Sequence, residues 1–247
     1  MDLFSYLLGK QSGGGGGGNL QEKTVTITED GTTVLTPDAG YDGFSKVTIN
    51  TETGTLPKIY QAVEWIAPQS SVQNDGQYIN TGVNVTSELK IEINLRTLVP
   101  DAKGLYGGGI GWENKSIQGE ADNISYFEFE NQTTHVSHTW GTFTDLYFVQ
   151  DKNVFSINEN VQYTFNYIPF ETDVPLTLLA INRNGVVGEY GTYVLYKCRI
   201  YDAGVLIREF IPCYRKADGE IGMFDTINKV FYTNAGTGTF SKGNDVN

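Results

Sequence analysis

The stretch VLYKCRIYDAGVLIREFIPCYR, Val194–Arg215, predicts two β-strands joined by a tight turn. Aromatic and β-branched residues are frequent in both halves, as is typical of strands, because such side chains pack well on a pleated surface. The residues between the halves, Asp202-Ala203-Gly204, are of the types that form turns. This hairpin indicates an all-β protein, provided that the rest of the chain follows the same pattern.

The only two cysteines, Cys198 and Cys213, fall in this hairpin. With Ala203 and Gly204 as the loop, Cys198 lies opposite Glu209, and the thiols are about 13 Å apart along the strands. A disulfide requires Cα atoms within about 7 Å of each other. We therefore expect two buried free thiols, which is consistent with synthesis in a reducing cytosol.

Segments of the same kind recur from about Ile59 to the C-terminus. They are short, rich in Val, Ile, Thr, Tyr and Phe, and separated by Gly, Asn and Asp. They are QYINTGV (77–83), KIEINLRTL (90–98), ISYFEFEN (124–131), DLYFVQ (145–150), QYTFNYI (162–168), LTLLAIN (176–182) and KVFYTN (229–234). Many short strands without helical periodicity between them predict one large β-sandwich over residues 57–247.

Residues 1–20 are of a different character. Residues 1–11 predict a short amphipathic helix, which is marginal in water by itself and needs a surface to dock on. Its apolar side is formed by Leu3, Phe4, Leu7 and Leu8. Residues 12–20 contain a run of glycines, Gly13 to Gly18, and predict a flexible linker. An inert spacer is the alternative, but a helix that needs a dock favours an anchoring segment on a tether.

Residues 21–54 predict a small β-module. TVTIT, the turn Glu29-Asp30-Gly31 and TTVLT are typical of a hairpin. A second turn follows at 37–40, and Val47 and Ile49 alternate on a third strand. Because the module has few apolar side chains, it can bury little apolar surface by itself. We therefore expect it to pack on a neighbour or on copies of itself.

The composition excludes several classes of function. The 17 basic and 29 acidic residues give a net charge of −12, with no basic cluster, which argues against binding to nucleic acid and to anionic membranes. No stretch approaches the roughly 20 apolar residues that cross a bilayer. The start MDLFSYLLGK lacks the features of a signal peptide, so we do not expect secretion by that route.

Two sets of residues carry a family resemblance. QYINTGV at 77–83 resembles the QYIDTG opening of a concanavalin A/laminin-G-like family, and the closing blocks at 195–202, 208–213, 221–225 and 231–234 are similar to those of the same family. This family is common in bacteriophage tail and fibre proteins and in surface proteins of gut bacteria. The resemblance implies a jelly-roll β-sandwich. Residues 85–185 match only in strand pattern, and we expect any ligand site there.

The N-terminal part carries a second resemblance. TVTITEDGTTVLTPDAGYDGFSKVTI, residues 24–49, looks like a short β-module of phage virion proteins. A Met-Asp-Leu-Phe start followed by a glycine run is similar to the openings of such proteins. The resemblance therefore implies a virion appendage.

The acidic residues lack the spacing of a glycosidase, which needs two carboxylates that flank the scissile bond. In related glycosidases these follow a Glu-x-Asp-x-Glu or Glu-x-Asp-x-x-Glu pattern. Glu120 and Asp122 begin such a pattern, but no second Glu follows at either position. Glu128 and Glu130 alternate with two phenylalanines and predict a half-buried strand with a solvated acidic side. We expect no enzymatic activity.

No metal or cofactor site is predicted. His135 and His138 are the only histidines, and their offset of three places them on opposite faces of a strand. A calcium site between loops stays open as an alternative, although neither Asp101 nor Asp122 belongs to an acidic cluster. GLYGGGIGW lacks the lysine and the following helix of a phosphate-binding loop.

Candidate sugar-binding residues are aromatic side chains with nearby amides, because sugar C–H groups pack on rings while amides bind hydroxyls. Tyr106, Trp112 and Asn114 in the glycine-rich loop LYGGGIGWENK, and Trp140, meet this description. The third tryptophan, Trp65, stands at the entry of the domain, where packing is the simpler interpretation.

These observations predict a non-enzymatic bacteriophage virion protein, a tail or head fibre that displays a lectin-like domain for host-surface glycans. The N-terminal segment would attach it to other virion proteins, at the virion surface, after synthesis in the host cytoplasm. A homo-oligomer is expected, and a trimer is plausible because fibres are often threefold. Three alternatives remain open: a decorating virion protein without ligand, a bacterial cell-surface adhesin, and a glycosidase.

Overall fold

The computed structural model describes residues 19–27, 35–51, 56–69, 76–98, 103–111, 114–120, 124–137 and 143–246. These residues form strands, turns and loops, and within them there is no helix, so none that could span a bilayer. The predicted helix at 1–11 and the glycine run lie outside the described residues. The chain divides into two compact units, Met1–Glu52 and Thr53–Asn247.

The first unit contains one two-stranded sheet. Strands β1 (Leu20–Ile27) and β2 (Gly43–Thr51) pair in parallel, and β2 is the third strand predicted for this module. A turn forms at 38–41, one residue later than the predicted 37–40, since the amide of Tyr41 donates to the carbonyl of Asp38 at 3.1 Å. The predicted hairpin turn, Glu29-Asp30-Gly31, lies outside the described residues. The predicted hairpin would pair β1 with an antiparallel neighbour, whereas in the structure β1 pairs in parallel with β2.

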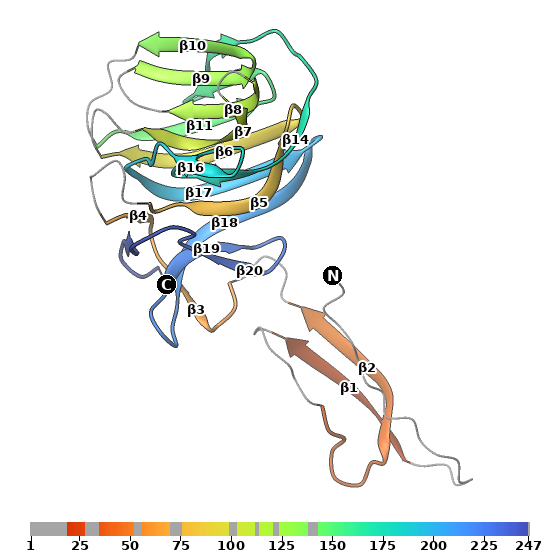
Figure 1. The fold of residues 1–247 in the computed structure, drawn as a ribbon. Coiled ribbons are helices and arrows are strands. Elements are labelled where there is room, and N and C mark those ends of the chain that lie inside the picture. Colours follow the sequence, from red (N-terminus) through yellow and green to blue (C-terminus); the bar gives the residue numbers. More distant parts are fainter. Residues whose placement is uncertain are drawn as a thin grey trace. The chain divides into compact units, whose positions relative to one another are not determined.

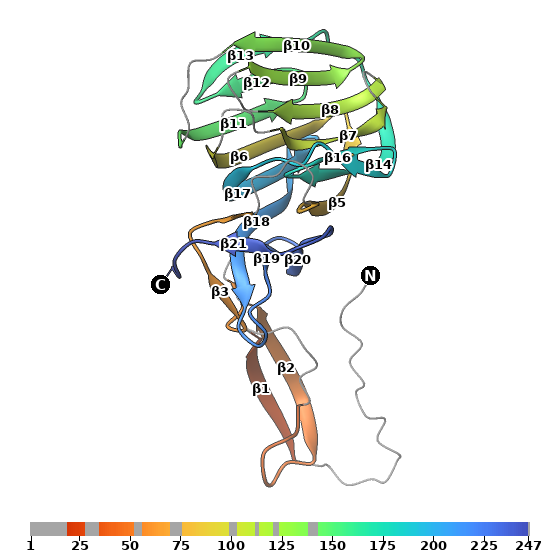
Figure 2. The ribbon, with the colours of Figure 1, turned by 60° about the vertical axis from the view of Figure 1, so that its left-hand side comes forward.

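The second unit is a sandwich of two sheets, as predicted (Figures 1 and 2). Sheet I has the order β10-β9-β8-β7-β14-β5, with β15 and β16 attached beside β7. Its strands are β5 (Ile79–Thr86), β7 (Gly104–Gly111), β8 (Asn114–Glu120), β9 (Ile124–Glu130), β10 (Gln132–Ser137), β14 (Glu171–Leu178), β15 (Ile181–Arg183) and β16 (Val186–Gly188).

Sheet II has the order β13-β12-β11-β6-β17-β18-β19-β20, with β3, β4 and β21 attached beside β17 and β18. Its strands are β3 (Tyr60–Ala62), β4 (Ile66–Pro68), β6 (Leu89–Thr97), β11 (Asp145–Asp151), β12 (Val154–Ile157), β13 (Asn160–Thr164), β17 (Tyr193–Asp202), β18 (Val205–Arg215), β19 (Ile221–Asp225), β20 (Val230–Thr233) and β21 (Phe240–Lys242). Each of the strand segments predicted for residues 57–247 overlaps one or two of these strands.

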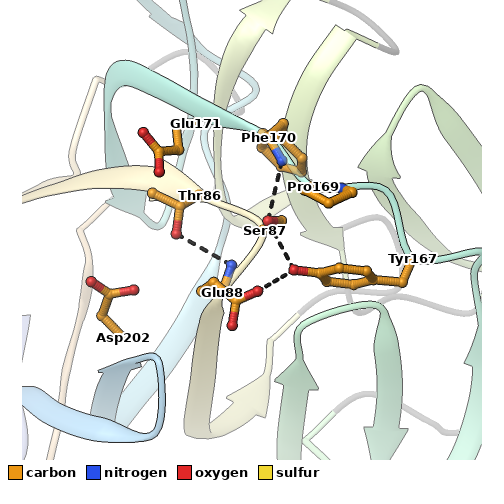
Figure 3. A pocket seen from close by; sticks show the side chains of 8 residues that line it. All are labelled: Thr86, Ser87, Glu88, Tyr167, Pro169, Phe170, Glu171 and Asp202. Carbon is orange, nitrogen blue, oxygen red and sulfur yellow. Dashed lines mark hydrogen bonds between the residues drawn. The ribbon is translucent and has the colours of Figure 1, made fainter.

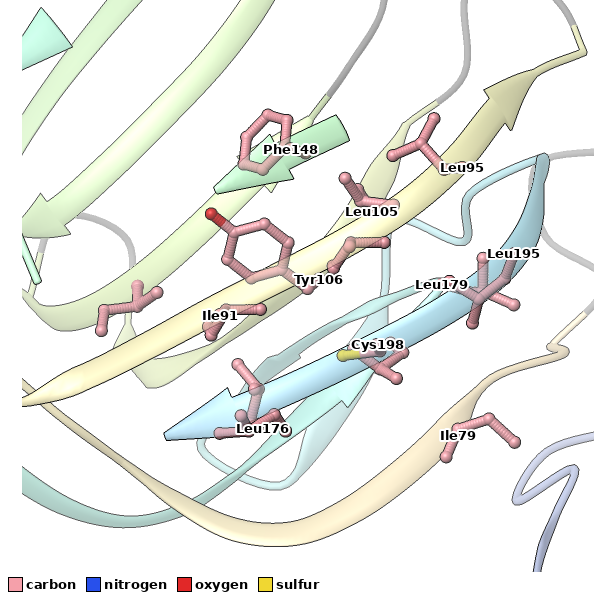
Figure 4. Packing of buried hydrophobic residues seen from close by; sticks show 14 of the residues in the cluster. Ile79, Ile91, Leu95, Leu105, Tyr106, Phe148, Leu176, Leu179, Leu195 and Cys198 are labelled. Carbon is pink, nitrogen blue, oxygen red and sulfur yellow. The ribbon is translucent and has the colours of Figure 1, made fainter. Parts of the chain in front are cut away.

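The core lies between the inner faces of the two sheets (Figure 4). Strand β6 shows why: Leu89, Ile91, Ile93 and Leu95 are buried, and the residues between them are more exposed. This period of two follows from side chains that alternate across a strand. From sheet I, Phe127 packs against two phenylalanines of sheet II, with ring centroids 4.7 Å from Phe155 and 5.6 Å from Phe148.

The β17–β18 hairpin confirms the expected turn and the expected thiols. Ala203 and Gly204 form the loop with positive φ angles of 46° and 83°. A β-bulge at Ile200/Tyr201 shifts the register by one residue, so Cys198 pairs with Phe210 rather than with Glu209. Both cysteines are buried and free. The predicted register was wrong beyond the bulge because a bulge leaves no clear mark in the sequence.

The glycine-rich segment is not the loop that was predicted. Gly104–Gly111 forms strand β7 in the middle of sheet I, and most of it is buried. Tyr106 points into the core, where its ring stands edge-on to Phe148 and its hydroxyl donates to Oε1 of Gln150 at 2.6 Å. Burial raises the pKa of the Tyr106 hydroxyl well above its usual range. Tyr106 is therefore a core residue, and its prediction as a sugar-binding residue was wrong.

The glycines of β7 allow a short hairpin, β15–β16, to lie against sheet I. A Cβ on Gly104 would stand 2.4 Å from the carbonyl oxygen of Glu189, which follows β16. A Cβ on Gly107 would stand 3.2 Å from Cγ1 of Ile181 at the start of β15. Residues with side chains would push the hairpin off the sheet, so the glycine run is explained by close backbone approach rather than by ligand binding.

We predict that Tyr106→Phe lowers the free energy of unfolding by about 1–3 kcal/mol, because it leaves a buried acceptor of Gln150 without its donor. Urea denaturation measures the change. Tyr163→Phe at an exposed position is the control, and we expect it to stay within about 0.5 kcal/mol of the wild type. Equal effects of the two substitutions would contradict the assigned hydrogen bond.

We predict that both thiols are unreactive in the folded protein. Burial raises the pKa of Cys213 to about 12 and raises that of Cys198 well above its usual range. Because thiolates are the reactive species, a disulfide reagent such as DTNB is expected to label neither cysteine under native conditions and both in denaturant. Rapid native labelling of either cysteine would show that the packing around it is open.

Candidate functional site

An open pocket of about 450 Å³ lies beside the β5–β6 turn, where three segments of the chain come together. It is lined by the end of β5 and the β5–β6 turn, by the segment between β13 and β14, and by the end of β17 (Figure 3). The lining residues are Thr86, Ser87, Glu88, Tyr167, Pro169, Phe170, Glu171 and Asp202. Its volume falls in the range of about 300–1,000 Å³ that small-ligand sites occupy.

The strand register brings these residues together. Glu171, the first residue of β14, pairs with Thr86 at the end of β5. Asp202, the last residue of β17, pairs with Leu89, the first residue of β6. The turn between β5 and β6 therefore lies between two carboxylates that come from distant parts of the chain.

Ser87 fastens the two main walls of the pocket to each other. Its amide donates to the carbonyl of Phe170 at 3.0 Å, and its hydroxyl accepts from the amide of Phe170 at 3.2 Å. The same hydroxyl lies 3.3 Å from the hydroxyl of Tyr167. These contacts hold the Tyr167 ring at the rim, where 42 % of the residue is exposed. The pocket is thus formed before any ligand binds.

Of the three carboxylates that line the pocket, that of Glu88 already has partners within the protein. Glu88 accepts a hydrogen bond from the hydroxyl of Tyr167 and forms an ion pair with Lys152 at 2.6 Å. The Lys152 ammonium and then the Tyr167 hydroxyl lower the pKa of the Glu88 carboxyl. Glu171 and Asp202 lie on the opposite side of the pocket from Tyr167 (Figure 3), and we expect them to present carboxylate oxygens to a ligand.

This arrangement can bind a polyhydroxylated ligand. A tyrosine ring offers an apolar face, and carboxylates accept hydrogen bonds from neighbouring hydroxyl groups. Among the described residues no group of three or more His, Cys, Asp or Glu side chains is arranged to hold a metal ion. The side chains that line the pocket offer a ligand hydrogen bonds and an aromatic ring.

A second polar cluster lies on the outer face of sheet I. In β9, Phe127 and Phe129 face the core as predicted, but Glu128 is 0 % exposed, so the predicted solvated acidic side was wrong. The carboxylate of Glu128 accepts hydrogen bonds from the hydroxyl of Ser116 and, at 3.2 Å, from that of Tyr126. The β15–β16 hairpin brings a further polar group to this face.

Arg183 at the end of β15 is the hairpin's contribution to this cluster. Its guanidinium donates to Oε1 of Gln118 at 3.0 Å, and Gln118 pairs across the sheet with Glu128. Burial lowers the pKa of Arg183, while the charges of Glu128 and Glu189 oppose that effect. We interpret this cluster as the anchor of the β15–β16 hairpin, since its groups satisfy one another.

The predicted site residues are not brought together in the pocket. Tyr106 is in the core, and Asn114 is exposed at the start of β8, where it is not part of the pocket lining. Trp112 and Trp140 lie outside the described residues. The same holds for the predicted anchoring residues Leu3, Phe4, Leu7 and Leu8, and for Asp101, Asp122 and His138, which were considered as metal ligands but not predicted to be so. His135 is exposed on β10, its ring edge-on to that of Tyr126.

Two features of the sequence point to the region of the pocket. Apart from Asp202, its lining residues fall between 85 and 185, the region in which a ligand site was expected. Tyr167 precedes Pro169 in a segment that connects two strands, and such connections commonly carry binding residues. Asp202 was assigned only to a turn, because its pairing with β6 depends on the register.

No protein-family model matches this chain, and no curated protein matches it. Among solved structures it is similar to a Bacteroides ovatus protein to which carbohydrate binding has been ascribed. The two share 11 % sequence identity with a TM-score of 0.45, over 81 % of this chain and 67 % of the other.

We predict that Glu128→Gln lowers the free energy of unfolding by about 1–3 kcal/mol, because an amide group replaces a buried carboxylate oxygen that accepts a hydroxyl. Urea denaturation measures the change. Glu171→Gln, at an exposed position, is the control and should change stability by no more than about 0.5 kcal/mol. An unchanged stability of the Glu128 variant would contradict its role in the anchor.

Proposed function

We propose that the sandwich is a glycan-binding module and that the pocket beside Tyr167 is its binding site. The observation that carries this proposal is an exposed tyrosine ring held at a fixed position across an open pocket from two carboxylates. A sugar offers two kinds of surface, a patch of C–H groups and a set of hydroxyls, and the pocket has a group suited to each.

The expected mode of binding follows from these positions. The sugar ring packs its C–H face on Tyr167, and Glu171 and Asp202 accept hydrogen bonds from hydroxyls on its far side. Glu88 keeps Tyr167 in place through the bond to its hydroxyl, and Lys152 holds Glu88 in turn. An anionic sugar is disfavoured because the pocket has an excess of negative charge.

We propose further that the module is displayed on a bacteriophage particle, as a tail or head fibre anchored by its N-terminal segment. The support is the sequence resemblance and the order of the segments: an apolar start, a glycine tether, a small β-module and the sandwich. Many copies on one particle would raise the avidity of a weak site. Mass spectrometry of purified particles tests this, and absence of the chain from them would contradict it.

We predict that Tyr167→Ala weakens glycan binding at least about tenfold, equivalent to about 1.4 kcal/mol, because the ring that supports the sugar is lost. A glycan array with the full chain identifies the ligand, and calorimetry with that soluble glycan measures the affinity. Tyr41→Ala is the matched control, since Tyr41 is 41 % exposed and Tyr167 is 42 % exposed.

Tyr167→Phe separates the ring from the hydroxyl, and we expect it to retain more affinity than the alanine variant. Equal affinities of Tyr167→Ala and the wild type would exclude this pocket as the site. Silence of the wild type across host polysaccharides would favour a decorating role without ligand.

A further inference from the structure

The pocket beside Tyr167 is lined by acidic side chains but by no basic ones. Its lining includes Glu88, Glu171 and Asp202, and no Lys, Arg or His. The charge of Glu88 is balanced by Lys152, whose ammonium lies 2.6 Å from the Glu88 carboxylate. The pocket therefore keeps two unbalanced negative charges, those of Glu171 and Asp202.

These two carboxylates have no ion-pair partner within the part of the chain that the structure describes. Lys90 lies close to Asp202 in the register of β6 and β17, since it follows Leu89, which pairs with Asp202. The ammonium of Lys90 is engaged elsewhere, because it binds the carboxylate of Glu92 at 2.9 Å. A ligand can therefore supply the positive charge that the pocket lacks.

Glu171 and Asp202 lie around the same turn. Glu171 pairs with Thr86 at the end of β5, and Asp202 pairs with Leu89 at the start of β6. Figure 3 shows both carboxylates on the side of the pocket opposite Tyr167, with Thr86 between them. A small cationic group bound beside Thr86 would thus have a carboxylate on either side.

The Tyr167 side of the pocket favours a ring over a simple ion. The Tyr167 ring is held by the contacts of its hydroxyl with Ser87 and Glu88, and it is exposed. An aromatic face packs against sugar C–H groups and also attracts a nearby positive charge. The ring and the carboxylates therefore act together on a ligand that combines a sugar ring with a cation. Carboxylates alone would not distinguish such a ligand from a simple ammonium ion.

We propose that the ligand of this pocket is an amino sugar with a free amine, whose ammonium lies between Glu171 and Asp202 while its ring packs on Tyr167. This inference rests on the proposed function and narrows its substrate class. An ammonium donates charge-assisted hydrogen bonds to carboxylates, which are stronger than those of a neutral hydroxyl or amide. Acetylation of the amine removes the charge, so the pocket distinguishes free from N-acetylated amino sugars.

Saturation-transfer difference NMR with the full chain tests this preference, because it detects weak binding of single sugars. The probes are glucosamine, galactosamine and mannosamine, each compared with its N-acetyl form, which has the same ring without the charge. At about pH 6 amines are protonated and carboxylates ionised. We expect the preferred free amine to bind at least about tenfold more tightly than its N-acetyl form at low salt. The ratio should fall as salt is added, because salt screens the attraction.

Two variants and a second ligand locate the effect. Asp202→Asn and Glu171→Gln remove one charge each at nearly unchanged shape, and each should lower the affinity ratio at least about threefold. Glu159→Gln is the matched control, since Glu159 is an exposed acid outside the pocket lining, and it should leave the ratio unchanged. Ethylammonium has the charge without the ring and should bind at least about tenfold more weakly than the amino sugar.

Equal binding of free and N-acetylated sugars, lost in Tyr167→Ala, would overturn the amine preference and leave the glycan site in place. Binding of the free amines that both charge variants retain, or that ethylammonium matches, would also overturn it. If none of these sugars binds while a glycan array finds a ligand that depends on Tyr167, the amino-sugar proposal fails alone. Silence in both assays would contradict the proposed function as well. Far-ultraviolet circular dichroism verifies that each variant is folded.

Discussion

The pairing of β6 with β11 on one side and with β17 on the other is the constraint on which the rest of the sandwich depends. It aligns Leu95 with Leu146 and with Leu195, so three strands turn the same faces toward the core. A slip of one residue would turn these apolar side chains outward, because side chains alternate with a period of two. The same register places Asp202 next to the β5–β6 turn and thereby forms one side of the pocket.

In sheet I, the main packing constraint is the short β15–β16 hairpin on its outer face. The glycines of β7 remove the side chains that would stand in the way, and Arg183 then reaches the polar row on β8 and β9. A buried carboxylate such as Glu128 is tolerated there because hydroxyl donors and a nearby guanidinium compensate for its lost water. The glycine run and the buried acid are thus two parts of one packing arrangement.

The two lateral edges of the sandwich differ in how they are closed. One edge is closed by backbone hydrogen bonds between the β20 exit and the β5 entry. The other is formed by the uncharged strands β10 and β13, with Tyr167 in the connection that leads away from β13.

The sequence by itself determined the fold class, the strand positions and the free thiols, because alternation of apolar residues and tight turns are local features. KIEINLRTL and VLYKCRIYD therefore predicted β6 and β17 closely. Only the tertiary structure decided where side chains meet. The burial of Tyr106 and Glu128, the bulge at Ile200, and the placement of Asp202 and Tyr167 around one pocket all depend on contacts between segments distant in the sequence. Local patterns carry no record of such contacts.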